Sequence, residues 1–429
     1  MAHQVGRPLV SPLLLLGGAV AILAVVLLMI AVPPRLIRGV AVSFTVVAAS
    51  FGLANFAPDA VRPPVAIAAI GVLVLALVRS RAVTSGGVRF WAVAAWWGFI
   101  SLSVLLTGSY GTNRIVLYFG LATLAAYVAS SLDRAELRMV YATIAGLAAV
   151  QVGLAFVEIL VLPEPIWGYT GKIRYNPFTS DVYARAQGTF GHPIVFAVSI
   201  GIALIVAWSN PARWSQKWRL VNLTVATVGL ALSGTRSAVA AVAVGLLVHV
   251  ALNSSLTSWL RSLIGVGAVV VVLLNIDIGI GTLVANLLES GSWSHRLGAL
   301  ESVRALLDRP PVEAWFGAGF GGEAILYDRG LMQQTFLRAV DNMLVYALGT
   351  TGIVGLLALL AFWTVAFCFA DRTIKAVLAM LFAMFFSFDL FTWMNAGVIT
   401  SLMIALPRAD RPATGVVPQP DSVPALRAV

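Results

Sequence analysis

The chain has 429 residues, of which 60% are hydrophobic and 11% are charged, and its mean hydropathy is +0.93. Soluble globular proteins carry about 25% charged residues, so this composition excludes a water-soluble domain and predicts a polytopic membrane protein. The net charge of +10 comes mostly from arginines scattered among loops, which favours a topology signal and attraction to anionic lipid or phosphate over nucleic-acid binding.

The predicted fold is an all-α bundle of about 12 transmembrane helices, because apolar runs near 20 residues must be helical in lipid. The final run breaks near Asp389 to Asn395, so it is either one span or two short helices. The first run is too long, and its basic flank too weak, for a cleavable signal peptide. In chain order the expected spans are 9–32, 36–56, 64–79, 90–107, 113–131, 138–161, 193–208, 219–233, 235–252, 259–277, 342–369 and 374–406.

Basic residues alternate between loops and predict the orientation of the bundle. If the basic loops are cytoplasmic, the N-terminus and two long loops, 162–192 and 278–341, lie outside. The loops expected on the cytoplasmic side carry Arg35 and Arg38, then Arg79, Arg81 and Arg89, then Arg134 and Arg138, then Arg213, Lys217 and Arg219, and finally Arg372 and Lys375.

These features divide the chain into four predicted parts. Residues 1–277 form a membrane bundle with the first outer loop, and residues 278–341 form an extracytoplasmic loop containing short helices. Residues 342–406 return to the membrane, and the proline-rich tail 407–429 is predicted to be disordered.

The most informative segment is the polar stretch from Ser294 to Gly355. It opens with an amphipathic piece, breaks at Asp308-Arg309-Pro310-Pro311, and continues through a glycine-rich turn at Gly317 to Gly322. It then re-enters an apolar helix at Asp341-Asn342. A transporter bundle does not need such a segment between spans, whereas an enzyme that works at a membrane face does.

Four polar clusters meet on the outer face in this topology: Arg185 to Pro193, Ser233 to Ser237, His295-Arg296 and Asp341-Asn342. An arginine fork suits phosphate oxygens, so three arginines on one face could hold a pyrophosphate and neutralise charge on a leaving group. A carboxylate could take a proton from an attacking hydroxyl, and Asp341 is the best-placed candidate. No zinc-type ligand cluster, P-loop or Ser-His-Asp arrangement is visible, so no metal or cofactor is expected.

Each of these residues also has a structural interpretation. Arg236 could reach lipid headgroups, and His192, before a proline, could cap or pack against a helix. His295 lies next to Arg296 and could have only a local role, while Asp341-Asn342 could be a helix N-cap, which does not exclude catalysis.

Two further features have open interpretations. The glycine-rich turn is either a flexible corner or a backbone nest for phosphate. The intramembrane carboxylates Glu158 and Asp389 are less easily explained as structural residues.

At these clusters the chain resembles the O-antigen ligase and O-antigen polymerase superfamily, integral-membrane glycosyltransferases of the GT-C type. The resemblance covers roughly residues 180 to 370 and rests on the order of several short motifs. These are R-x-x-G-T-F-x-H-P at Arg185 to Pro193, S-G-T-R-S at Ser233 to Ser237, Arg296, G-x-G-x-G at Gly317 to Gly321, and D-N-x-L at Asp341 to Leu344 with Gly352 and Gly355 after it.

The resemblance implies a metal-independent enzyme of the bacterial plasma membrane, with its site on the extracytoplasmic face. It implies a donor saccharide on undecaprenyl pyrophosphate and a glycan or lipid acceptor hydroxyl. Carried over by position, Arg185, Arg236 and Arg296 hold the pyrophosphate. The family's histidine position is Asp341 here, with His192, His295 and Asn342 as accessory candidates. Either Asp341 replaces the histidine as base, or His192 or His295 does, or this chain has a different acceptor or little activity.

Two other functional classes remain open. A transporter or flippase of lipid-linked saccharides would need inverted repeats or broken helices near the bilayer midplane. A non-catalytic partner in envelope assembly is the third possibility, because the family's histidine is missing. The sequence leaves ligase and polymerase undistinguished.

Overall fold

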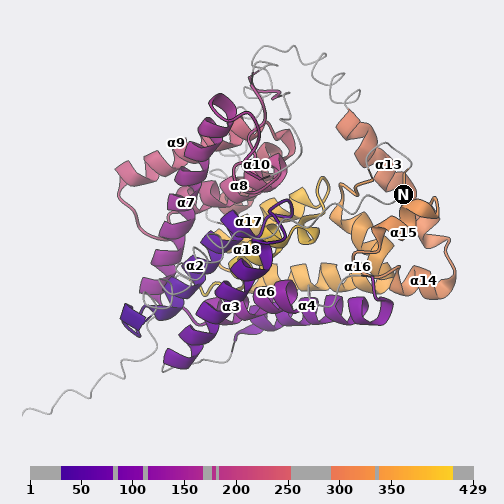
Figure 1. Cartoon of the computed structure of the whole chain (residues 1–429), viewed down its shortest axis with the longest axis horizontal. Coiled ribbons are helices and arrows are strands. Elements are labelled where there is room, and N and C mark those ends of the chain that lie inside the picture. Colours follow the sequence, from indigo (N-terminus) through magenta and orange to yellow (C-terminus); the bar gives the residue numbers. More distant parts are fainter. Residues whose placement is uncertain are drawn as a thin grey trace, which may run out of the picture.

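The computed structural model describes residues 30–80, 86–109, 115–167, 176–179, 183–252, 291–333 and 338–408. Across these ranges the chain is helical and contains no β-strand, which confirms the all-α fold class (Figure 1). The expected spans 9–32 and 259–277 and the tail 407–429 lie almost wholly outside the described residues.

The helices described before residue 253 match expected apolar segments closely. Proline at the first position of α8 and glycine after α9 fit the usual start and stop signals of helices. The elements are α2 (Ile37–Gly52), α3 (Arg62–Arg79), α4 (Val88–Thr107), the π-helical turn η1 (Ile115–Gly120), α6 (Leu121–Ser130), α7 (Arg134–Leu160), α8 (Pro193–Ser209), α9 (Gln216–Ser233) and α10 (Arg236–Ala251).

The C-terminal part begins with a cap segment over residues 291–341 and ends with apolar helices. The last apolar run is two helices, because α17 stops at Met384 and α18 begins at Met394. The elements are α13 (Gly291–Leu307), α14 (Pro311–Phe316), α15 (Glu323–Asp328), α16 (Met343–Phe369), α17 (Arg372–Met384), the 3₁₀ turn η2 (Leu390–Thr392) and α18 (Met394–Ala405).

Four of the described helices, α3, α4, α7 and α16, are long and apolar enough to cross a membrane. A second group of apolar helices is shorter, with 10–17 residues each: α2, α8, α10, α18 and the stretch Leu117–Ser130. These helices are compatible with a membrane protein, and the count of about 12 spans stays a prediction.

The core lies around α18, all of whose residues are buried. Aromatic rings from α4, α16 and α17 surround it: the Trp96 and Phe362 rings stack with centroids 5.7 Å apart, and those of Trp363 and Phe385 lie 4.6 Å apart. The indole N–H of Trp97 donates to Ser401 Oγ at 2.9 Å, which gives the buried polar group a partner.

The bundle has two ends that differ in chemistry. Buried Glu136 marks one of them, because it completes the capping box of α7 with Asp133 and pairs with Arg38 at 2.9 Å. At the other end of α7, buried Glu158 holds the loop that leads into α8. With 17 residues, α8 separates the two ends by about 25 Å.

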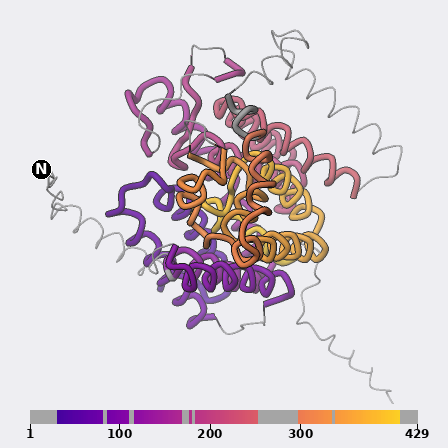
Figure 2. Tube along the Cα trace, turned by 90° about the vertical axis from the view of Figure 1, so that its right-hand side faces the viewer, coloured from indigo at the N-terminus to yellow at the C-terminus, as the bar shows by residue number. Residues whose placement is uncertain are grey.

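The cap segment covers one end of the bundle, where α13, α14 and α15 lie beside α16 (Figures 1 and 2). It is attached at a break in α16, where Gly352 has φ of 70°. A break of this kind leaves backbone carbonyls of the preceding turn without helical partners. The carbonyl oxygens of Leu348, Gly349 and Thr350 instead accept hydrogen bonds from the cap segment.

Arg309 is the side chain that fills this break. Its guanidinium donates to the carbonyls of Leu306 at 2.7 Å, Gly349 at 2.9 Å and Leu348 at 3.0 Å, and the residue is only 6% exposed. The sequence suggested only a chain break at this position, whereas the arginine is a buried anchor for the cap segment.

Candidate functional site

The loop that precedes α8 is positioned by two polar side chains of α7. The Glu158 carboxylate accepts the N–H groups of Gln187 at 3.2 Å and Gly188 at 2.6 Å. About two helical turns earlier on the same face of α7, the Gln151 amide bonds both the N–H and the hydroxyl of Thr189. Glu158 therefore has a structural role, because it holds the loop that carries Arg185 and His192.

Arg185 joins this loop to the turn between α9 and α10. Its Nε donates to the Ser233 carbonyl and its terminal NH2 group to Thr235 Oγ1, both at 2.9 Å. Glycine at position 234 permits this contact, since its φ is +60° and a Cβ there would lie 2.9 Å from Arg185 Cγ. Arg236 follows Thr235 as the first residue of α10, so the two predicted phosphate arginines lie at the same turn.

Of these two arginines, Arg185 is engaged with the turn and Arg236 is more available. Arg236 is partly exposed, and its guanidinium makes no hydrogen bond or ion pair with any residue that the structure describes. Its planar fork is therefore the better candidate to contact an added anion.

His192 is the N-cap of α8, as its structural interpretation anticipated. Its Nδ1 accepts the N–H of Ile194 at 3.1 Å, and its ring packs against Trp393 with centroids 5.2 Å apart. Burial first, and then the positive charge of Arg185, lower the pKa of His192 to about 3. The imidazole is therefore neutral at physiological pH, with its Nδ1 already used as an acceptor.

The second half of the site is acidic and lies where α16 begins. Asn342, not Asp341, is the N-cap of α16: its Oδ1 accepts the N–H groups of Leu344 at 3.0 Å and Val345 at 3.1 Å. The neighbouring Asp341 is half-buried and is not required for capping.

Asp341 lies near two other carboxylates and a phenol of the cap segment. The pKa of the Tyr327 phenol is raised by burial and then by the charges of Asp341, Asp389 and Glu323. Glu323 in turn accepts the hydroxyl of Tyr346 at 3.2 Å. The three carboxylates come from the end of the cap segment, from the turn between α17 and α18, and from α15.

Asp389 is an acid that retains its proton. It lies in the turn between α17 and α18, outside both helices, and its Oδ2 accepts the hydroxyl of Thr392 at 2.8 Å. Burial by the surrounding protein, followed by the negative charge of Asp341, raises its pKa to about 8. Asp341 thus contributes to the raised pKa of Asp389 through its negative charge.

The turn between α17 and α18 links the arginine half of the site to the acidic half. On one side, the Met343 N–H at the start of α16 donates to the Phe385 carbonyl at 2.8 Å. On the other side, the rings of Phe388 and Trp393 pack against His192, and Asn395 Nδ2 donates to the Phe190 carbonyl at 3.3 Å. Both halves therefore lie at the same end of the bundle.

The structure does not test two of the predicted residues. Arg296 and His295 fall within α13, which packs along α16, but their side chains lie outside the described part of the chain. The donor-binding role of Arg296 therefore stays a prediction.

The glycine-rich turn is not available as a phosphate nest. The N–H groups of Ala318 and Gly319 bond the α16 carbonyls, that of Phe320 bonds Ser103 Oγ, and that of Gly321 bonds the Tyr346 hydroxyl at 3.0 Å. Its backbone donors thus serve the attachment of the cap segment to α4 and α16.

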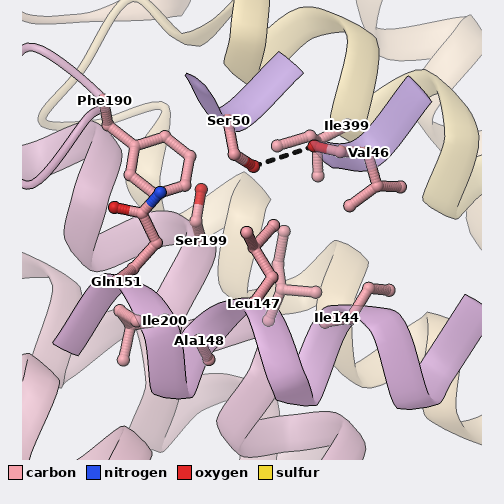
Figure 3. A pocket seen from close by; sticks show the side chains of 11 residues that line it. Val46, Ser50, Ile144, Leu147, Ala148, Gln151, Phe190, Ser199, Ile200 and Ile399 are labelled. Carbon is pink, nitrogen blue, oxygen red and sulfur yellow. Dashed lines mark hydrogen bonds between the residues drawn. The ribbon is translucent and has the colours of Figure 1, made fainter. Parts of the chain in front are cut away.

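A small cavity of about 20 Å³ lies between α2, α7, α8 and α18, beside Phe190 (Figure 3). Its polar lining residues are Ser50, Gln151 and Ser199. Ser50 already bonds the Val46 carbonyl, and Gln151 bonds Thr189. Because it has room for about one water, it is a packing space and not a substrate site.

The structure brings Arg185, Arg236, His192, Asp341 and Asn342 to one end of the bundle, and their roles stay predictions. The sequence did not indicate that Asp341 lies near Asp389. The available signal was an acidic residue, Asp389, within an otherwise apolar run of the sequence. Among the described residues, no group of three His, Cys, Asp or Glu side chains is arranged to hold a metal ion. Comparison with known protein families and with curated proteins finds no match to this chain.

Proposed function

We propose that the protein is a membrane glycosyltransferase of the O-antigen ligase or polymerase type. It transfers a saccharide from a polyprenyl pyrophosphate donor to a glycan or lipid hydroxyl at the outer face of the bacterial plasma membrane. The observation that carries this proposal is the position of the turn between α17 and α18. It contacts His192, which lies near the turn between α9 and α10 that holds Arg185 and Arg236 (the arginine turn). It also contacts Met343, two residues after Asp341.

In this proposal, the arginine turn binds the donor. Arg236 contacts the pyrophosphate oxygens, and Arg185 holds the turn and adds its positive charge. Arg296, at its position on α13, is the third donor-binding candidate. As the bond between the anomeric carbon and the pyrophosphate oxygen breaks, both electrons go to that oxygen, and the arginines neutralise the charge that develops there.

Asp341 is the proposed base for the acceptor. It takes the proton of the acceptor hydroxyl while that oxygen attacks the anomeric carbon. The raised pKa of Asp389, about 8, makes that residue a poor acceptor for this proton near neutral pH, so Asp341 is the base that we propose. Aspartate thereby takes the position at which the resembling family has histidine.

The test uses purified full-length protein in liposomes that contain lipid-linked oligosaccharide, with product length and acceptor labelling as readouts. Arg236→Ala is expected to lose transfer by about 100-fold or more, as removal of a group that stabilises charge in the transition state does. Arg304→Ala, at an exposed position on α13, is the matched control and should retain transfer. Full activity of Arg236→Ala would refute the pyrophosphate role.

Asp341 is tested by comparing Asp341→Asn with Asp341→His. The asparagine variant keeps the size and polarity of the side chain but cannot accept a proton, so transfer should be lost. The histidine variant restores a base and should retain part of the activity. If Asp341→Asn transfers saccharide at the wild-type rate, Asp341 is not the base, and a non-catalytic envelope-assembly role becomes the better proposal.

A transporter or flippase remains a second candidate, because α16 is broken at Gly352. Broken helices of transporters expose backbone carbonyls to a ligand. Here Arg309 and the N–H groups of Ala318 and Gly319 already donate hydrogen bonds to those carbonyls. The break therefore serves to attach the cap segment to α16. Movement of unchanged lipid-linked saccharide across the liposome membrane, without product formation, would support the transporter instead.

A further inference from the structure

A second polar site lies at the opposite end of the bundle. An open cavity of about 260 Å³ is formed there by the start of α7, the end of α8 with the loop that follows it, the end of α10 and the start of α17. Four arginines line it: Arg134, Arg138, Arg213 and Arg372. They come from three loops that the charge pattern assigned to the cytoplasmic side.

The positive charge of this cavity exceeds the negative charge around it. Asp371 is the acidic residue of the lining, and its carboxylate already accepts the Ile374 N–H at 2.8 Å as the N-cap of α17. Nearby Asp133 caps α7 in the same way, and buried Glu136 pairs with Arg38. The guanidinium groups of Arg138 and Arg213 make no hydrogen bond or ion pair with the residues that the structure describes.

The loop after α8 is shaped to place Arg213 on the cavity wall. Asn210 and Arg213 have φ of 51° and 59°, and they are the non-glycine residues of the described chain with positive φ. The Asn210 side chain holds the loop closed, because its Oδ1 accepts the Trp214 N–H at 2.7 Å and its Nδ2 donates to the Trp214 carbonyl at 3.0 Å. Such unfavourable backbone conformations persist where the surroundings enforce them and gather at binding sites.

Tryptophans at the same helix ends indicate the depth of the cavity. Trp208 near the end of α8 is 40% exposed, and Trp218 near the start of α9 is 60% exposed. Arg219 lies over the Trp208 ring at 5.9 Å. Exposed tryptophan beside arginine is typical of the headgroup level of a bilayer, where anionic phosphates are abundant.

We propose that this arginine cavity binds a phosphate group, with the headgroup of an anionic phospholipid of the cytoplasmic leaflet as the source that its depth favours. The cavity admits the phosphate between Arg138 and Arg213, with Arg134 and Arg372 on the remaining walls. This binding is separate from glycosyl transfer and does not depend on the proposed function.

The experiment measures thermal stabilisation of the purified full-length protein in detergent, with three added probes. These are phosphatidylglycerol, phosphatidylcholine as the zwitterionic control, and inorganic phosphate. Native mass spectrometry of the same samples counts bound lipid. The test variant is Arg138→Gln with Arg213→Gly, because glycine accepts the positive φ of position 213 and so preserves the loop. Arg304→Gln with Arg329→Gly, on the cap segment, is the matched control.

We expect saturable stabilisation by phosphatidylglycerol, a dissociation constant at least tenfold higher in the test variant, and no change in the control variant. Equal stabilisation by inorganic phosphate, lost in the same variant, supports the phosphate site and identifies a soluble ligand as its source. Two results overturn the proposal. The first is that neither phosphatidylglycerol nor inorganic phosphate binds saturably. The second is wild-type affinity in a test variant that elutes as a folded, monodisperse protein.

Discussion

At the scale of single residues, the environment of each carboxylate decides what it can do. Glu136 and Glu158 are buried but bonded by an arginine or by backbone N–H groups, so they stabilise loops and helix ends. Asp341 lies near enough to Asp389 for its negative charge to add to the effect of burial, and together they raise the pKa of Asp389 to about 8. Asp389 is therefore expected to make the stability of the protein depend on pH.

Asp389→Asn is expected to change how stability depends on pH. The folded-state pKa near 8 lies above the unfolded value of 3.8, so the folded protein keeps a proton that the unfolded chain has lost. The unfolding free energy of the wild type should therefore fall by up to about 1.4 kcal/mol per pH unit as pH rises toward 8. Asparagine mimics the protonated acid, so this slope should vanish.

Thermal midpoints in detergent between pH 6 and pH 9 measure this effect, with the variant more stable than the wild type at the upper end. If the thermal midpoints of the wild type and Asp389→Asn change with pH in the same way, Asp389 does not retain a proton in the folded protein.

Local sequence signals predicted the capping residues of the site, because a cap depends on neighbours within a few positions. Proline after His192 and an apolar run after Asn342 were sufficient. The proximity of Asp389 to Asp341 could not be predicted in this way, since it depends on how α16, α17 and α18 pack together.

At the scale of elements, α16 and the cap segment form one structural unit. The break at Gly352 brings the helix backbone against that of Trp315, and Gly317 lies equally close to Thr350. The glycine pattern of the sequence marked these positions as unusual. It did not show that the two glycine-containing segments are each other's partners, because their contact joins backbones and not side chains of a recognisable type.

Gly352→Ala is expected to lower the unfolding free energy by more than about 2 kcal/mol, because its φ is +70° and a Cβ would lie 2.3 Å from the Trp315 backbone. Gly146→Ala in α7 is the control, since nothing lies within 4 Å of its added Cβ, and it should be neutral or stabilising by up to about 1 kcal/mol. Unfolding midpoints in detergent compare them. Equal midpoints would mean that α16 tolerates a straight path at this position.

Arg309→Met is expected to lower the unfolding free energy by roughly 3 kcal/mol, because it removes the donor to the Leu306 and Leu348 carbonyls and leaves Gly349 with only the 3.3 Å bond from Ala318. The same change at Arg304, whose side chain is 93% exposed, should cost less than about 0.5 kcal/mol. The two variants are compared by thermal denaturation and by protease cleavage of the cap segment. A stable, protease-resistant Arg309→Met protein would exclude the anchor role.

At the scale of the whole molecule, the chain places arginines and carboxylates at one end and an arginine-lined cavity at the other. Arg134, Arg138, Arg213 and Arg372, which the alternation of basic loops assigned to one side, line one cavity. The orientation of the bundle in the membrane stays a prediction. The order in which helices neighbour one another was not predictable, because apolar surfaces of similar composition carry little pairing information.

The proposed orientation is tested by cysteine labelling in a Cys368→Ser background, which removes the chain's one native cysteine. Val312→Cys, on the cap segment and 73% exposed in the wild type, should react with a membrane-impermeant maleimide in intact spheroplasts. Lys217→Cys, at the exposed start of α9, should react only after the membrane is opened. The reverse pattern would invert the topology and place the proposed site on the wrong face for an external acceptor.

The way in which Arg309, Ala318 and Gly319 complete the broken helix also constrains biogenesis. These residues leave the ribosome before Leu348, Gly349 and Thr350, the residues whose carbonyls they bond. In the proposed orientation, the cap segment is therefore translocated first and waits, undocked, until α16 has entered the bilayer. Final shaping of that helix is thus a late step of assembly, and a chain arrested before it would display an undocked cap to proteases and chaperones at the membrane surface.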